Sequence, residues 1–265
     1  DTYEGAPTPV TAFLSVASKA GGFVALLNII FFGFGARSSM WWGVVWMFAA
    51  ASMTLGNLTA LRQTNLVRML AYSSVAQGGF ILVPFAAYGI ARDHGDMAVA
   101  QSAFQSVVIY LLVYGAMNLG AFGVVIAVSR RTRSASIDSF SGLFNTSPVL
   151  TVLMSIFLAS LAGIPPFAGW FAKFTMFRAA IDAGGWAGTS IAVIAGVNSV
   201  IAAYYYLNVV RTMWFKAPAE GAAPVPVPPA LATSLLICVV LVVVVGVFPG
   251  VFGHIGELAA RVTGG

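Results

Sequence analysis

Two lysines lie well inside long apolar segments of this 265-residue chain. Lys19 is about midway along the first such segment, and Lys173 is in the fifth. A charge at the centre of a membrane helix costs roughly 2.5–3.5 kcal/mol, so such residues usually face a protein interior or a water path. Two lysines that release and regain protons would form a proton relay. The alternative is a structural pair neutralised by carboxylates, but no Asp or Glu lies in the middle of an apolar segment.

The fifth segment carries helix-breaking residues shortly before Lys173. Pro165 and Pro166 lack backbone N–H donors and clash with the preceding turn, while Gly163 and Gly169 permit the chain to unwind. Non-helical backbone at membrane depth is tolerated only inside protein or beside a wet cavity, and in transporters such breaks mark ion sites. The alternative is a simple proline kink in a packing helix. The nearby lysine favours a functional break around Gly163–Gly169.

Polar side chains in the third and fourth apolar segments could connect the two lysines through water. They are Ser73, Ser74 and Gln77, spaced three and four apart, and Tyr110, Tyr114 and Asn118, which recur every four residues. Residues at these spacings share a helix face. The alternative is ordinary hydrogen bonding between helices, which is common in membrane bundles.

The elements that must position these residues are membrane-spanning helices. Apolar residues make up 59% of the chain and charged residues 8%, against about 25% charged in a typical soluble domain. So few charges cannot cover a soluble core, which indicates that lipid covers it. About seven segments are long enough to cross a bilayer. They are residues 8–34, 40–61, 67–90, 99–129, 148–182, 186–214 and 229–252. The sequence therefore predicts an all-α membrane protein.

Several classes of site are excluded by the residue types. The single cysteine, Cys238, cannot form a disulfide framework or a thiolate cluster, and His94 and His254 have no second ligand at metal spacing. No phosphate-binding loop, dinucleotide fingerprint or nucleophile–base set is present. The net charge is +5, but the basic residues lie between apolar runs rather than clustered on one solvated face, which argues against nucleic-acid binding. We therefore expect no cofactor, metal or redox site in this chain.

The loop charges predict an orientation. Lys and Arg outside the apolar interior fall into two sets on alternate sides of the membrane. The larger set is Arg62, Arg68, Arg130, Arg131, Arg133, Arg211 and Lys216, and the smaller is Arg37, Arg92, Arg178 and Arg261. The richer side is normally cytoplasmic, which places residue 1 inside and the C-terminus on the outer, periplasmic side. The sequence begins Asp-Thr-Tyr without Met or a basic leader, so we expect it to start inside a longer chain.

Four stretches together resemble a known family. They are Asp1–Lys19, Leu61–Gln77, Tyr114–Gly123 and Ser160–Lys173. The chain is similar over nearly its whole length to the antiporter-like subunits of the proton-pumping NADH–quinone oxidoreductase, respiratory complex I. The details favour subunit N over L and M.

The resemblance implies an inverted-repeat fold with broken helices, of which residues 1–265 would be the C-terminal part of one transmembrane domain. It implies that Lys19 is the middle proton-channel lysine and Lys173 the terminal one, with a further lysine and its acidic partner upstream. It also implies a bacterial inner-membrane complex with other membrane subunits as partners. The whole complex would use NADH, FMN, iron–sulfur clusters and a quinone, none of them bound by this chain.

Two positions depart from the family pattern. Val67 replaces a lysine at a helix start, and Gln77 replaces a histidine found in many relatives. Glutamine cannot titrate, although it can orient water. The predicted function is proton translocation coupled to quinone reduction, as a subunit of an NADH:quinone oxidoreductase. The alternatives are a subunit of a multisubunit Na⁺/H⁺ antiporter or membrane-bound hydrogenase, and a membrane scaffold without its own proton path.

Overall fold

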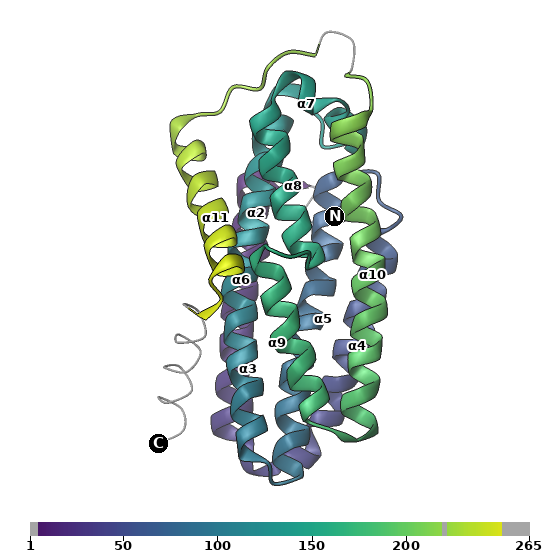
Figure 1. Ribbon diagram of the computed structural model, residues 1–265, viewed down its shortest axis with the longest axis vertical. Coiled ribbons are helices and arrows are strands. Elements are labelled where there is room, and N and C mark those ends of the chain that lie inside the picture. Colours follow the sequence, from purple (N-terminus) through teal and green to yellow (C-terminus); the bar gives the residue numbers. More distant parts are fainter. Residues whose placement is uncertain (1–4, 219–221, 251–265) are drawn as a thin grey trace.

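Six helical stretches are long and apolar enough to cross a membrane in the computed structural model, which describes residues 5–218 and 222–250 (Figure 1). Five are single helices: α4 (Trp42–Ala60), α5 (Leu66–Asp93), α6 (Met97–Thr132), α10 (Gly185–Phe215) and α11 (Pro229–Val247). The sixth runs from Thr8 to Phe31. It combines α2 (Thr8–Phe13), the π-helical turn η1 (Leu14–Ser18), α3 (Lys19–Leu27) and most of a second π-helical turn, η2 (Asn28–Gly33).

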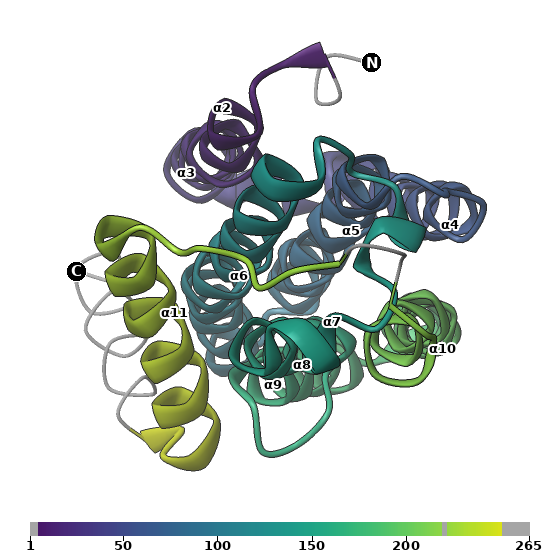
Figure 2. The same ribbon diagram turned by 90° about the horizontal axis from the view of Figure 1, so that it is seen from above.

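A seventh crossing is made by two shorter helices, α8 (Pro148–Ala162) and α9 (Ala168–Asp182). Each has 15 residues, or about 22 Å, which is too short for a hydrocarbon core of about 30 Å. They follow one another along the bundle, and they overlap when seen from above (Figures 1 and 2). Together they span the predicted segment 148–182, so the predicted break is confirmed. With the six longer stretches, they bring the crossings within the described residues to seven.

Short helices complete the connections. They are η3 (Gly35–Met40), η4 (Ile137–Phe140) and α7 (Leu143–Thr146). Local signals explain several helix starts: Asn65 Oδ1 accepts from the N–H of Arg68, and Asp96 Oδ1 accepts from that of Val99. Prolines occupy the first turns of α8 and α11, where no donor is needed. The predicted seventh segment was too long, because Pro249 disfavours helical backbone at Phe248 and α11 ends at Val247. Residues 251 and 252 of that prediction lie outside the described residues.

The centre of the bundle is formed by α5 and α6. Within their most apolar windows, 89% of α5 and 72% of α6 are buried, against 22% to 33% for α4, α10 and α11. The helix α4 packs along α5, the broken pair α8–α9 packs against α6, and α11 contacts α6 and α9 (Figure 2). The polar residues predicted on the third and fourth segments therefore lie at the core.

The break between α8 and α9 is closed by its own hydrogen bonds. Gly163 has a φ of 90°, which glycine adopts without a steric penalty. Its N–H donates to Ser160 O at 2.9 Å, and the N–H of Ile164 donates to Ala159 O at 3.0 Å. This pair of bonds is the Schellman motif, which satisfies carbonyls at a helix end. Ser160 Oγ also accepts from the N–H of Gly169 at 3.0 Å, which ties the start of α9 to the end of α8.

Replacing Gly163 by alanine should destabilise the protein. Left-handed backbone costs an ordinary residue about 1–2 kcal/mol, and a Cβ at this position would lie 2.7 Å from Cδ of Lys173. We expect the purified full-length Gly163→Ala protein to melt at a lower temperature in the same detergent.

The matched control is Gly196→Ala. Gly196 lies inside α10, and its added Cβ would meet no atom within 4 Å. Its melting temperature should stay the same or rise slightly, because alanine favours helix. Equal melting temperatures for the two variants would contradict the role given to Gly163.

Candidate functional site

Lys19 lies directly after the π-helical turn η1. Its Nζ donates a hydrogen bond to the backbone carbonyl of Ser74 on α5, and it lies 5.3 Å from the ring centroid of Tyr114 on α6. Isolated π-helical turns inside helices occur frequently at functional sites. The sequence contains no signal that predicts this turn. The structure thus joins Lys19 to both central helices.

Lys19 is half-buried because it also faces a pocket of about 460 Å³. Besides apolar side chains, the pocket is lined by Ser52 on α4, Arg68 and Ser74 on α5, and Lys19 itself. Arg68 is in the first turn of α5, near the membrane end at which that helix begins. The pocket therefore extends along α5 from Leu82, past Lys19, to the end of the bundle where α5 begins.

Lys173 is buried, with 6% of its surface exposed. Its Nζ donates to Ala162 O at 3.0 Å and to Ser199 Oγ on α10 at 3.3 Å, and it lies 4.6 Å from the centroid of the Phe80 ring. Ala162 is the last residue of α8, so its carbonyl belongs to the negative end of that helix dipole. The sequence predicts only the unfavourable positive end at the start of α9. The structure adds an opposing, favourable contact.

Gln77 is the centre of a hydrogen-bonded cluster that joins α5, α6 and α10 to the end of α8. Tyr110 donates to Gln77 Oε1 at 2.8 Å. Gln77 Nε2 donates to Leu161 O at 3.2 Å and to the hydroxyl of Tyr206 on α10 at 3.4 Å. Tyr206 is in turn hydrogen-bonded to Ser73. Since Leu161 precedes the residue that binds Lys173, the cluster reaches the break itself.

The other predicted polar residues lie beside Lys19 or the π-helical turn that precedes it. Asn118 Nδ2 donates to Ser15 Oγ at 2.8 Å, and the Tyr114 hydroxyl donates to Ser15 O at 3.3 Å. Ser15 lies within the π-helical turn before Lys19. Among the described residues, no group is in hydrogen-bonding position for the buried Oδ1 of Asn118. The six predicted residues thus form two groups, Ser73, Gln77 and Tyr110 near the break and Ser74, Tyr114 and Asn118 near Lys19.

Sequence reasoning missed the contributions of α10. Ser199 binds Lys173, and Tyr206 joins Gln77 to Ser73. A separate cluster connects this helix to α4, where Tyr205 donates to Asn57 Oδ1 at 3.0 Å and Asn57 donates to Asn198. The signal was a run of polar residues, Asn198, Ser199 and Tyr204 to Tyr206, inside an apolar segment.

Lys19 and Lys173 have no carboxylate partner in the described part of the chain. Neither lysine forms an ion pair there, and no three His, Cys, Asp or Glu side chains gather as a metal site among those residues. His254 lies outside the described residues, as do Arg261 and the C-terminus that the orientation prediction concerns. The two lysines present amines, and the residues around them present hydroxyls and amides that donate and accept hydrogen bonds.

Known proteins are similar to this chain in sequence and in fold. The family described as "NADH:quinone oxidoreductase/Mrp antiporter, TM" matches residues 1–199. NADH-quinone oxidoreductase subunit N of Desulforamulus reducens is 38% identical over 261 residues, which cover 98% of this chain and 52% of that protein. The chain spans about half the length of the curated relatives that it matches.

Solved structures of membrane complexes contain chains with a similar fold. A chain of respiratory complex I from Thermus thermophilus, with bound aureothin, has a TM-score of 0.77 and 30% identity, over 95% of this chain and 52% of its own length. A chain of the Mrp complex from Dietzia sp. DQ12-45-1b has a TM-score of 0.81 over 98% of this chain and 54% of its own, at 22% identity, and shares the fold. The chain is therefore an integral membrane protein that belongs to the NADH:quinone oxidoreductase/Mrp antiporter transmembrane family and resembles its subunit N.

Proposed function

We propose that this chain is part of a proton-translocating membrane subunit of an NADH–quinone oxidoreductase, in which Lys19 and Lys173 bind and pass on protons. One observation carries the proposal. The Lys173 amine is buried at a helix break, and the described residues supply carbonyl and hydroxyl partners rather than a carboxylate. A structural lysine would be expected to have a neutralising partner, because unpaired buried charge is costly.

The partners of Lys173 suit a group that changes its protonation state. A carbonyl oxygen and a hydroxyl can accept from an ammonium or from a neutral amine, so the contact with Ala162 survives loss of the proton. The side chain therefore keeps its position in both states. Electrostatic repulsion would make charging of one lysine raise the cost of charging the next.

The hydrogen-bonded cluster would carry protons between the lysines. Ser73, Gln77, Tyr110 and Tyr206 reach the break, while Ser74, Tyr114 and Asn118 reach the Lys19 helix. Hydroxyl groups both donate and accept, and Gln77 orients its neighbours without titrating. Water at the unpartnered Asn118 Oδ1 would join the two groups.

We also propose that residues 1–265 form the C-terminal part of one antiporter-like transmembrane domain. The upstream part would supply the further lysine and its acidic partner. Other membrane subunits would be its neighbours, and NADH, FMN, iron–sulfur clusters and a quinone would be bound elsewhere in the complex. Residue 1 would lie on the cytoplasmic side. The names and the 38% identity of the curated relatives support this assignment over an antiporter subunit, since the Mrp likeness, at 22% identity, concerns the fold alone.

Replacing either lysine by methionine should uncouple proton movement from electron transfer. In the assembled complex in proteoliposomes, we expect Lys19→Met and Lys173→Met to slow proton uptake on the order of 10²-fold or more, because a positioned proton-transfer group typically contributes about that much to the rate. Proton uptake is followed with a pH-sensitive dye beside the rate of quinone reduction. The control is Lys216→Met, since Lys216 is exposed and pairs with Asp138. Unchanged proton-to-electron ratios in both lysine variants would refute the relay.

Removing the Tyr206 hydroxyl should impair the cluster selectively. Tyr206→Phe deletes the bonds to Ser73 and Gln77, each worth roughly 0.5–1.5 kcal/mol. We expect slower proton uptake and a lower melting temperature than in Tyr204→Phe. Tyr204 is the matched control because 66% of its surface is exposed and its hydroxyl has no hydrogen-bond partner in the described ranges. Identical uptake by the two variants would remove Tyr206 from the path.

A further inference from the structure

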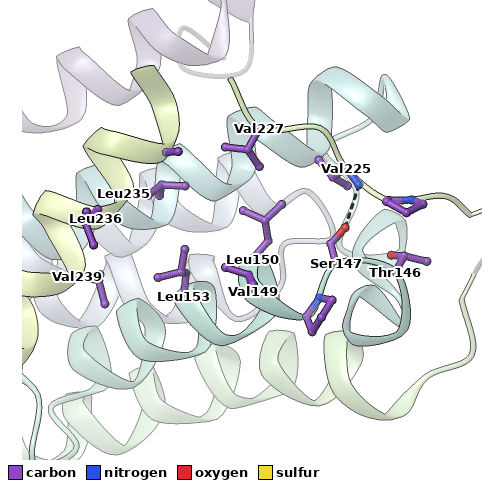
Figure 3. A pocket seen from close by; sticks show the side chains of 13 residues that line it. Thr146, Ser147, Val149, Leu150, Leu153, Val225, Val227, Leu235, Leu236 and Val239 are labelled. Carbon is purple, nitrogen blue, oxygen red and sulfur yellow. Dashed lines mark hydrogen bonds between the residues drawn. The ribbon is translucent and has the colours of Figure 1, made fainter. Parts of the chain in front are cut away.

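An apolar groove lies on the outside of the bundle between α8, α11 and the chain that leads into α11. It encloses about 430 Å³. Six of its lining residues are valines or leucines of the two helices: Val149, Leu150, Leu153, Leu235, Leu236 and Val239 (Figure 3). The N–H of Val225 donates to Ser147 Oγ at 2.9 Å, which fixes the connecting chain over one end of the groove. The groove therefore has the apolar lining that an acyl chain requires.

A polar pocket of about 350 Å³ adjoins the same end of the groove. Arg131, Thr132, Ser139 and Ser141 line it together with apolar residues, and it shares Thr146 and Val225 with the groove. The apolar groove thus continues into a pocket that carries one arginine and several hydroxyl groups. An apolar groove beside a pocket with polar groups would suit a ligand that has an apolar and a polar part.

The donors of this pocket are available to a ligand. Arg131 is exposed and forms no ion pair with any described carboxylate, and the hydroxyls of Ser139 and Ser141 have no acceptor among those residues. The neighbouring carboxylate, Asp138, is already paired with Lys216 at 2.8 Å. A phosphate group would complement the pocket, since it offers negative charge and several acceptor oxygens.

The position of the pocket fits a lipid headgroup. The helix α6 ends at Thr132, while α8 begins at Pro148 and α11 at Pro229, all at one end of the bundle (Figure 1). The pocket is therefore at the level where headgroups lie, and the groove descends from it along α8 and α11 to acyl-chain depth.

We infer that the groove and the pocket form a binding site for one anionic phospholipid, with its phosphate beside Arg131, Ser139 and Ser141 and an acyl chain between α8 and α11. Charge complementarity selects the headgroup, and the apolar walls hold the chain. The site is independent of the proton relay.

The test uses the full-length protein in detergent, titrated with phosphatidylglycerol or phosphatidylcholine and followed by native mass spectrometry. Arg131→Gln should weaken phosphatidylglycerol binding about fivefold, since a basic residue near an anionic headgroup contributes about 1 kcal/mol. Arg130→Gln removes the same charge from a residue that lines neither cavity, and it should change binding little.

A second pair of variants tests the groove. Val149 is 70% exposed, so Val149→Trp should fill the groove without disturbing the core, and it should weaken binding of both lipids. Val193→Trp, at an exposed position on α10, should not. Equal effects of Arg131→Gln and Arg130→Gln would overturn the inference. So would unchanged lipid retention in Val149→Trp, or occupation of the groove by another subunit in the assembled complex.

Discussion

The carbonyl group of Ala162 lies at the end of α8, where no later helical residue can donate to it. At membrane depth such a group needs a partner within the protein. The Schellman bonds at Gly163 satisfy the carbonyls of Ala159 and Ser160, and Lys173 satisfies that of Ala162. This one hydrogen bond therefore satisfies two buried polar groups, the last carbonyl of α8 and the amine of Lys173.

The surrounding helices are arranged around this contact. The stem of Lys173 lies so close to Gly163 that a Cβ there would overlap it, and Ser199 on α10 supplies the second acceptor. The cluster centred on Gln77 begins one residue earlier, at the Leu161 carbonyl. The central helices α5 and α6 extend the polar contacts to the π-helical turn before Lys19. Polar contacts therefore run from each lysine into the two central helices.

Much of this architecture could be predicted from residue types. Long apolar runs predict the spans, and glycines flanking Pro165 and Pro166 predict the break beside Lys173. The partner of that lysine could not be predicted, because every residue carries a carbonyl and only the fold selects Ala162. The choice of Tyr206 from three consecutive tyrosines also depends on how α10 is rotated. The π-helical turn before Lys19 contains two serines and no proline, and serines inside an apolar run do not by themselves predict a π-helical turn.

The most direct test is an experimental structure of the assembled complex at a resolution that shows ordered water. We expect a continuous hydrogen-bonded chain from Lys19 through Asn118 and Gln77 to Lys173, with a water bound at the free Oδ1 of Asn118. A dry apolar layer between the two lysines, in every functional state, would contradict it.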